Sequence, residues 1–558
     1  MTDIANLIER INQESELQIL TGNASVAREL KTLVLQHRGQ AQAELSRIAT
    51  LESWLEVQAA AIAGNKLQPA SQQQMLQIWE QVIEADSERF PDLQAGTLAP
   101  QVHRAWLRLV RWQIDDSKLS ELEQYNDLQL CNWCQKFESR LAELGFYQRD
   151  LILKQFDSVA EKRPLLFVSG GDQIAPLHLA FLQKSFSTIE QSLWRDDQNS
   201  ADCSQANFAS PELEIDSAAA WALEKTNRDP NARIGILCTE NNAAQKTTIR
   251  RLEAQLRSAS ARICLPQNAI DSGIFSSALQ LLQLNRHELS RTQCRALIQS
   301  PFWGDYPADL EQRAIWEAEL CGLERKYLRT GDLISTARTA ATKLNTERSQ
   351  SLSQKLVTCR ELPRELTDSD AKQPLHHWAE LFSRQLEALG WPGTRDLNIG
   401  QQQLVELFRD LIQQLVSLGA VEPATNCTTA LRLLSRLAQT AQVPAQAPAK
   451  GINILNTVES ALGFTHLWLI DSSADQWPGL VKPDPLIPIQ LQLEYDMPRC
   501  HPEQERAFCI NLFEQLRGNA QQVVFSISQK DADRETEFSP LLPQYPELDL
   551  SFLPSQIG

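Results

Sequence analysis

The pattern of hydrophobic and polar positions repeats one local order several times along the chain. An apolar run at residues 17–20 is followed by a polar turn and by apolar residues at helical spacing over 26–34. This order predicts a strand, a turn and a helix. It recurs over residues 164–185 and 233–256. Further apolar runs predict strands at 452–455, 467–470 and 523–527.

Two long stretches follow a different, helical pattern. Residues 44–156 and 275–440 carry apolar residues at spacings of mostly three and four. Residues 195–210 form a polar stretch, and the Ala-, Gln- and Pro-rich residues 442–450 are interpreted as a connector. Strands that alternate with helices are typical of a parallel α/β sheet. The predicted order is therefore α/β, helical, α/β, helical, α/β.

Composition favours a soluble, multi-unit protein. The 558 residues exceed one hydrophobic core, and 42% hydrophobic residues with 13 Trp and 18 Phe provide ample apolar surface to bury. The chain shows no signal segment and no uncharged run as long as the ~18 residues that a membrane span needs. We expect a cytoplasmic protein without a membrane partner. The 11 cysteines, an odd count without a dense framework, are interpreted as reduced thiols.

The formal net charge of −17 sets a condition on nucleic-acid binding. Such a surface repels a phosphate backbone, so DNA contact needs a localised basic groove or a partner subunit. Two clusters at helical spacing are candidates: Arg104, Arg108 and Arg111, and Arg250, Arg251 and Arg257. A solvated helix face is the favoured interpretation of both clusters.

The most specific motif lies near the C-terminal end. A predicted strand at 451–455 is followed by a segment with Glu459 and Gly463, by a second strand, and by an acidic-x-Trp-Pro turn formed by Asp475, Trp477 and Pro478. This series resembles the fifth helicase motif of the AddB and RecB type. Residues 483–508 resemble the region of the sixth motif.

With these motifs in order, the chain resembles the AddB-like, RecB-family proteins of bacterial DNA repair over nearly its whole length. The resemblance implies two RecA-like parallel-sheet cores, each with a large helical insertion, as in superfamily 1A helicases. It places the first core at 1–43 and 157–205 and its insertion at 44–156. It places the second core at 206–275 and 445–558 and its insertion at 276–444. Longer relatives end in a PD-(D/E)XK nuclease domain, which we expect to be absent from this polypeptide.

The turn that matches an ATP-binding loop lacks the residues for ATP chemistry. Such a loop needs glycines that expose backbone N–H groups, a Lys for the phosphate charge and a hydroxyl for Mg²⁺. The matching turn holds Thr21, Gly22, Asn23 and Ser25, with Arg28 farther along the helix. No Lys-Ser or Lys-Thr pair closes it. These positions are interpreted as a vestigial nucleotide site.

The carboxylates and the arginine of a motor are also missing in this alignment. Ser169 and Gly170 stand where an Asp-Glu pair would hold Mg²⁺ and orient water. The arginine-finger position falls on residues 512–515, which contain no arginine, although Arg517 follows closely. We therefore expect no ATP hydrolysis and no bound cofactor.

Nuclease and metal chemistry have only weak candidates. A PD-(D/E)XK site needs paired acidic strands and a Lys, whereas Glu324-Arg325-Lys326 lies in a helical pattern and Gln529-Lys530 has no acidic strand before it. The single CxxC, Cys131 to Cys134, has no second pair to complete a zinc or iron–sulfur site. Cys134 shares an apolar helical stripe, so we expect a buried core cysteine and no metal.

Three functional hypotheses follow from the sequence. The first is an inactivated helicase-like scaffold subunit that binds or guides DNA in double-strand-break or recombination repair, with a helicase or nuclease partner subunit. The second is a truncated helicase-like nuclease whose nuclease domain is lost or separately encoded. The third is a protein–protein adaptor without DNA contact, which the net charge of −17 favours.

Overall fold

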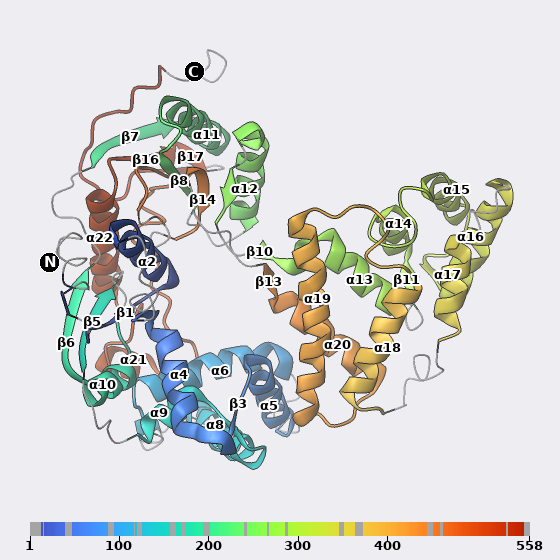
Figure 1. Ribbon diagram of the computed structural model, residues 1–558, viewed down its shortest axis with the longest axis horizontal. Coiled ribbons are helices and arrows are strands. Elements are labelled where there is room, and N and C mark those ends of the chain that lie inside the picture. Colours follow the sequence, from blue (N-terminus) through green and yellow to red (C-terminus); the bar gives the residue numbers. More distant parts are fainter. Residues whose placement is uncertain are drawn as a thin grey trace. The chain divides into compact units, whose positions relative to one another are not determined.

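The computed structural model describes most of the chain and divides it into two compact units (Figure 1). The larger unit consists of Met1–Ala70, Ile78–Leu265 and Ala445–Gly558, and the smaller of Ser71–Gln77 and Pro266–Pro444. The four-part division of the sequence analysis is finer and stays a prediction. The described residues are 10, 13–14, 16–38, 47–86, 94–115, 118–119, 125–156, 163–169, 173–193, 201–238, 243–259, 261–264, 267–284, 288–344, 351–362, 372–443, 450–457, 461, 463–531 and 534–551.

The first sheet of the larger unit has four parallel strands. Their order is β2 (Ile48–Thr50), β1 (Gln18–Thr21), β5 (Arg163–Ser169) and β6 (Phe186–Leu193). Strand β1 lies between β2 and β5, and its Ile19, Leu20 and Thr21 are buried. The predicted strands at 17–20 and 164–168 are both confirmed.

Helices cover both faces of this first sheet. Ile19 packs with α2 (Ala24–Arg38) in one hydrophobic cluster, whereas its neighbour Leu20 packs in another with α4 (Leu51–Ala63). This split follows the period of two along a strand. The second cluster also takes in α9 (Arg149–Lys154) and α10 (Pro176–Ser185).

The second sheet has six strands, and each described pairing in it is parallel. One face packs against α11 (Pro211–Arg228) and α12 (Ala243–Gln255), and the other against α22 (Pro502–Asn519). The strand order is β7 (Asp202–Phe208), β16 (Gln522–Ser528), β15 (His466–Leu469), β8 (Arg233–Leu237), β14 (Gly451–Leu455) and β9 (Arg262–Ile263).

The sequence pattern misses strands β6 and β7. Both are edge strands that carry several polar side chains, and β7 buries Ser204 beside its apolar residues. Such a strand shows no continuous apolar run, so residues 195–210 look like a polar connection in the sequence. Strand β7 runs across the predicted boundary between residues 205 and 206.

The rest of the larger unit is mainly helical. It includes α6 (Ala95–Arg111) and α8 (Tyr125–Glu143), with a short strand pair, β3 (Gln68–Pro69) and β4 (Phe146–Tyr147). Trp79, on α5 (Gln72–Glu84), stacks on Phe137 at a centroid distance of 4.1 Å. Trp106 meets the same ring edge-on at 4.9 Å. Aromatic side chains thus form the core here, in agreement with the predicted helical stripe.

The smaller unit is a helical bundle around one core. Its longest helices are α16 (Thr330–Leu344), α18 (Leu375–Ala388), α19 (Ile399–Ser417) and α20 (Cys427–Thr440). The shorter ones are α13 (Gly273–Gln283), α14 (Arg291–Gln299), α15 (Leu310–Cys321) and α17 (Ser351–Arg360). Two strand pairs complete the unit: β10 (Gln267–Asn268) with β13 (Gln442–Val443), and β11 (Leu289–Ser290) with β12 (Tyr327–Leu328).

The predicted fold class is therefore confirmed at a coarse level. The protein is helix-rich and contains two sheets built from parallel strands. Residues 300–304 and 391–393, which contain Pro and Gly, lie between helices. One local expectation is wrong: Glu324-Arg325-Lys326 lies between α15 and β12 and is not helical, because Arg325 turns back to pair with Asp332 at 2.9 Å.

Candidate functional site at the junction of the two sheets

Three hydrogen bonds close the turn after β1, while the buried Asn23 Nδ2 has no partner among the described residues. The Thr21 hydroxyl donates to the Asn23 carbonyl at 2.8 Å, and the Asn23 side-chain oxygen accepts from the Val26 N–H at 2.9 Å. Asn23 thus caps α2, whose first N–H groups otherwise lack partners. The Gly22 N–H donates to the Val168 carbonyl at 3.2 Å. The turn is held by hydrogen bonds from within the protein.

No lysine lies at this turn, and the cation nearest to it in the sequence, Arg28, is exposed to solvent. Arg28 is exposed on α2, in agreement with a solvated helix charge. Ser25 is half-buried in the first turn of the helix. A phosphate at this place would meet helix N–H groups but no fixed side-chain cation.

The second vestigial position lies beside the first. Thr21 pairs with Val168 in the sheet, so the strand end at Ser169 follows directly next to the turn. Only the backbone of Ser169 is described, and Gly170 lies outside the described residues. The parallel pairing of β1 with β5 thus brings the two predicted positions to one sheet edge, because the carboxyl ends of adjacent parallel strands lie side by side.

A contact between the two sheets brings in the fifth-motif segment. Glu29 of α2 accepts from Arg233 of β8 at 2.8 Å, and the Arg233 guanidinium lies 4.9 Å from the centre of the Phe464 ring. Gly463 has a left-handed φ of 75°, and a Cβ there would collide with the Glu29 carboxylate. Glycine at 463 therefore permits α2 to approach the segment before β15.

The other fifth-motif residues serve the packing of the second sheet. Trp477 is buried, its ring lies 5.2 Å from the Phe513 ring of α22 at a tilt of 47°, and it precedes Pro478 through a cis peptide bond. The Ser539 hydroxyl donates to the Trp477 carbonyl at 2.6 Å. Asp475 is exposed. Glu459 lies outside the described residues, so its predicted role stays untested.

Sequence reasoning did not single out the ion pair of Glu29 with Arg233. Both residues look like ordinary surface charges, one on a helix and one at a strand start. The same holds for Glu214, which is buried and accepts from the Asp471 N–H at 2.9 Å and from the Ser526 hydroxyl. A carboxylate in the first turn of a helix, as Glu214 is in α11, carries no spacing signal, because its partners come from distant segments.

The predicted basic clusters are largely engaged in ion pairs. Arg111 donates to the buried Asp150 at 2.8 Å, and Asp150 also contacts Arg149 and His178, each at 3.0 Å. This fourfold cluster is structural, since a buried charge must be paired. Hydrogen bonds from His178, and then the charges of Arg111 and Arg149, outweigh burial and hold the pKa of Asp150 far below its usual value.

In the second basic cluster, one arginine is likewise paired with a carboxylate. Arg251 forms a two-pronged pair with Asp216, with distances of 2.8 and 2.6 Å. Arg250 and Arg257 are exposed. Neither cluster is therefore an uninterrupted line of free cations.

The two cysteines of the CxxC lie in the core of the larger unit. Cys131 and Cys134 are buried on α8, in agreement with a core role. Within the described ranges, no group of three or more His, Cys, Asp or Glu side chains is placed to hold a metal ion.

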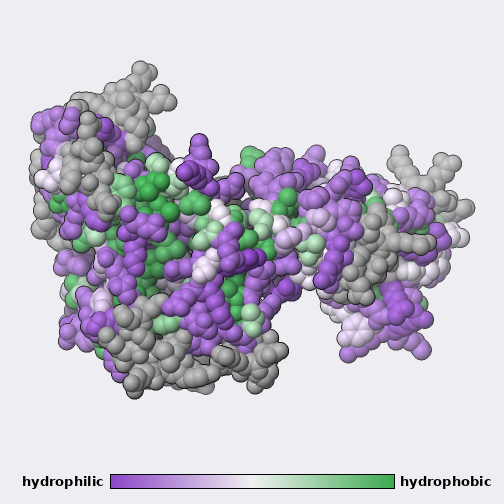
Figure 2. Space-filling view, turned by 90° about the horizontal axis from the view of Figure 1, so that it is seen from below, coloured by the Kyte–Doolittle hydropathy of each residue, from purple (hydrophilic) through white to green (hydrophobic). Residues whose placement is uncertain are grey.

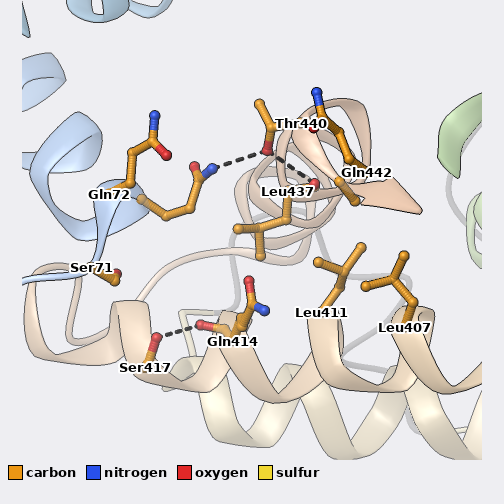
Figure 3. Close-up of a pocket in the computed structure, with 11 residues that line it drawn as sticks. Ser71, Gln72, Leu407, Leu411, Gln414, Ser417, Leu437, Thr440 and Gln442 are labelled. Atoms are coloured by element: carbon orange, nitrogen blue, oxygen red, sulfur yellow. Dashed lines mark hydrogen bonds between the residues drawn. The ribbon is translucent and has the colours of Figure 1, made fainter. Parts of the chain in front are cut away.

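The smaller unit carries an open pocket of about 530 Å³ (Figure 3). Leu407, Leu411 and Leu437 supply its apolar floor. The Gln73 amide donates to the Thr440 hydroxyl at 3.0 Å across its rim. All the lining residues are uncharged, so the pocket has neither a cation for phosphate nor an acid–base pair for catalysis.

Comparisons with known proteins match the chain to no protein-family model and to no curated protein sequence. In the part of the chain that the structure describes, no helix has the length and apolar character needed to cross a membrane.

Proposed function

We propose that this protein is a helicase-like scaffold that does not hydrolyse ATP and that acts in bacterial DNA repair, in contact with DNA and with a helicase or nuclease partner subunit. The finer fold belongs to this proposal: the two parallel sheets correspond to RecA-like cores, and the helical regions to their insertions. The observation that supports the proposal most directly is the arrangement at the junction of the two sheets. There, the turn after β1 is closed by Asn23 without a lysine.

The ion pair at this junction supports a role without turnover. A motor changes the relation of its two cores as nucleotide binds and leaves. Here Glu29 joins the helix after β1 to Arg233 of the second sheet, and Arg233 is in turn packed on Phe464. Glu29 already engages the Arg233 guanidinium, so this cation is not free to neutralise a phosphate at the junction.

The DNA-repair part of the proposal rests on the resemblance of the sequence motifs. The order of strand, Gly463 and Trp477-Pro478 turn supports it. A scaffold without ATP chemistry fits an acidic protein that touches DNA locally, since a positive surface can coexist with a net charge of −17.

A protein–protein adaptor is the second candidate, and one observation favours it. Several large apolar side chains are exposed, namely Leu480 at 85%, Ile399 at 77% and Val57 at 65%. Figure 2 shows apolar residues reaching the surface of the larger unit among mainly hydrophilic ones. Exposed apolar surface of this kind is typical of partner contacts.

ATP turnover tests the proposal. The purified protein is incubated with Mg²⁺-ATP alone, with single-stranded DNA and with duplex ends, beside an active superfamily 1 helicase as positive control. We expect no DNA-stimulated phosphate release. Turnover near the ~1–100 per second of ordinary phosphoryl-transfer enzymes would contradict the proposal.

A further inference from the structure

Two arginines of α6 converge on one buried carboxylate. Arg104 Nε lies 3.6 Å and Arg108 NH1 lies 3.4 Å from Asp484 Oδ2. The Asp484 side chain is 1% exposed, whereas that of Arg104 is 58% exposed. Among the described residues, none donates a hydrogen bond to Asp484 Oδ2. Asp484 therefore holds both guanidinium groups in place, yet its single charge neutralises only one of them.

The loops around α21 (Ile489–Glu494) bring two more cations to this place. The Lys482 N–H donates to the Arg499 carbonyl at 3.1 Å, so these two exposed residues lie side by side in two neighbouring loop segments. Lys482 is two residues from Asp484. We call Arg104, Arg108, Lys482 and Arg499 the basic surface.

The backbone of this loop is held in an unusual form. Asp496 and Arg499 both have left-handed φ values, 51° and 65°, which non-glycine residues adopt rarely. The Gln504 amide donates to Asp496, and the Cys500 thiol donates to the Met497 carbonyl. Such conformations persist where surrounding contacts fix them, and they occur often at binding sites.

The basic surface carries an excess of positive charge. Arg104 and Arg108 contact Asp484, and Arg499 is only loosely paired with Glu505 at 3.8 Å. With Asp496 of the same loop counted as well, four cations stand beside three carboxylates, so one positive charge remains in an otherwise acidic protein. Arg111 does not belong to this surface, because Asp150 binds it and fixes the end of α6.

We propose that the basic surface binds the phosphodiester backbone of DNA. Guanidinium groups match phosphate oxygens in geometry, and cations spread over a helix and two loops suit a repeating line of charges better than a single anion. This assignment rests on the proposed function, which supplies DNA as the polyanion, and it names the residues that contact it.

The salt dependence of DNA binding tests the assignment. The double variant Arg104→Gln with Lys482→Gln removes two exposed cations. We expect weaker binding to a fluorescent duplex, and a slope of log K against log salt that is smaller by roughly 1.8, the value for two lost contacts with a duplex. The matched control, Arg250→Gln with Arg257→Gln, removes the same charge from exposed arginines elsewhere and keeps the slope of the native protein.

A third variant changes affinity in the opposite direction. Asp484→Asn removes the charge between Arg104 and Arg108 but keeps the side-chain oxygen that accepts from the Leu486 N–H at 3.1 Å. We expect it to bind DNA more tightly than the native protein. Circular dichroism during heating checks that each variant is folded.

The possible outcomes separate this assignment from the proposed function. If the native protein binds DNA but the Arg104–Lys482 double variant keeps the native slope, the basic surface is not the contact and the scaffold proposal stands. Unchanged affinity of Asp484→Asn also contradicts the assignment. If the native protein binds neither duplex nor single strands at low salt, the basic surface and the DNA part of the proposed function both fail.

Discussion

Gly463 lies just before β15 of the second sheet, and Glu29 lies on α2, which covers the first sheet. The two residues meet at the junction on which the functional proposal rests. The left-handed backbone at Gly463 is available to glycine at little cost, and it leaves room for the Glu29 carboxylate beside Arg233. One residue thus determines how closely α2 approaches the second sheet.

The substitution Gly463→Ala is expected to destabilise the larger unit. It imposes about 1 kcal/mol for the left-handed backbone and forces the Glu29 carboxylate away, so the total should reach about 2–4 kcal/mol. Gly145→Ala is the control, because Gly145 has a similar φ of 71° with open space around its Cβ direction. Urea unfolding measures both. Equal losses for the two variants would show that the contact with Glu29 contributes nothing.

A second residue dominates the core of the smaller unit. The buried Arg313 donates to both Asp309 oxygens and to the carbonyls of Ile298, Ser300 and Trp303. Its guanidinium also lies 4.7 Å from the centre of a Trp303 ring. These contacts explain the break in helical periodicity at residues 300–304, because one arginine replaces the missing helical hydrogen bonds.

Arg313→Lys should therefore be far from conservative. Lysine keeps the charge but leaves buried carbonyls without donors, at a cost of about 3–5 kcal/mol. Arg295→Lys, at an exposed pair with Glu317, should change stability by less than about 1 kcal/mol. Hydrogen exchange of peptides from α14 and α15 reports the difference. Unchanged exchange in the Arg313 variant would contradict the structural role.

At the scale of elements, α5, α6 and α8 are tied by a histidine that stays neutral. The Trp79 indole donates to His103 Nδ1 at 3.1 Å. Burial, and secondly the positive charge of Arg111, lower the pKa of His103 to about 4. Protonation would abolish this acceptor inside an aromatic core.

Acid should weaken this helical region through His103. In the unfolded chain the imidazole binds a proton below its ordinary pKa of 6.5, whereas in the folded protein it does so only below about pH 4. The free energy of unfolding should thus fall by on the order of 3 kcal/mol from this group between these two pH values, and the contribution should be constant at lower pH. His103→Asn keeps an acceptor for Trp79 and does not titrate. Identical pH profiles of unfolding for the two proteins would refute this account.

The strands with continuous apolar runs could be predicted from the sequence, and the polar edge strands could not. Runs such as Ile452–Leu455 are buried on both faces, so they show in hydropathy alone. Strands β6 and β7 carry several polar side chains and are defined by backbone pairing with a neighbour. The turn at Thr21–Ser25 was predictable as well, because Gly22 and its polar neighbours interrupt the apolar pattern. The pairs Glu29–Arg233 and Arg104–Asp484 were not, because each joins segments far apart in sequence.

At the scale of the whole molecule, the net charge and the junction of the two sheets lead to one expectation about DNA binding. A protein with net charge −17 binds DNA only through a local surface, and in the proposed function the junction held by Glu29 and Arg233 does not respond to nucleotide. DNA binding should therefore be steeply weakened by salt and indifferent to nucleotide.

DNA affinity with and without Mg²⁺-ATP, with phosphate release followed in the same sample, tests the central claim most directly. Fluorescence anisotropy of a forked duplex at low salt gives the dissociation constant. We predict measurable binding, the same constant in both conditions, and no phosphate release above that of a sample without protein. A constant that changes several-fold with Mg²⁺-ATP while phosphate accumulates would contradict the account of a scaffold without ATP chemistry.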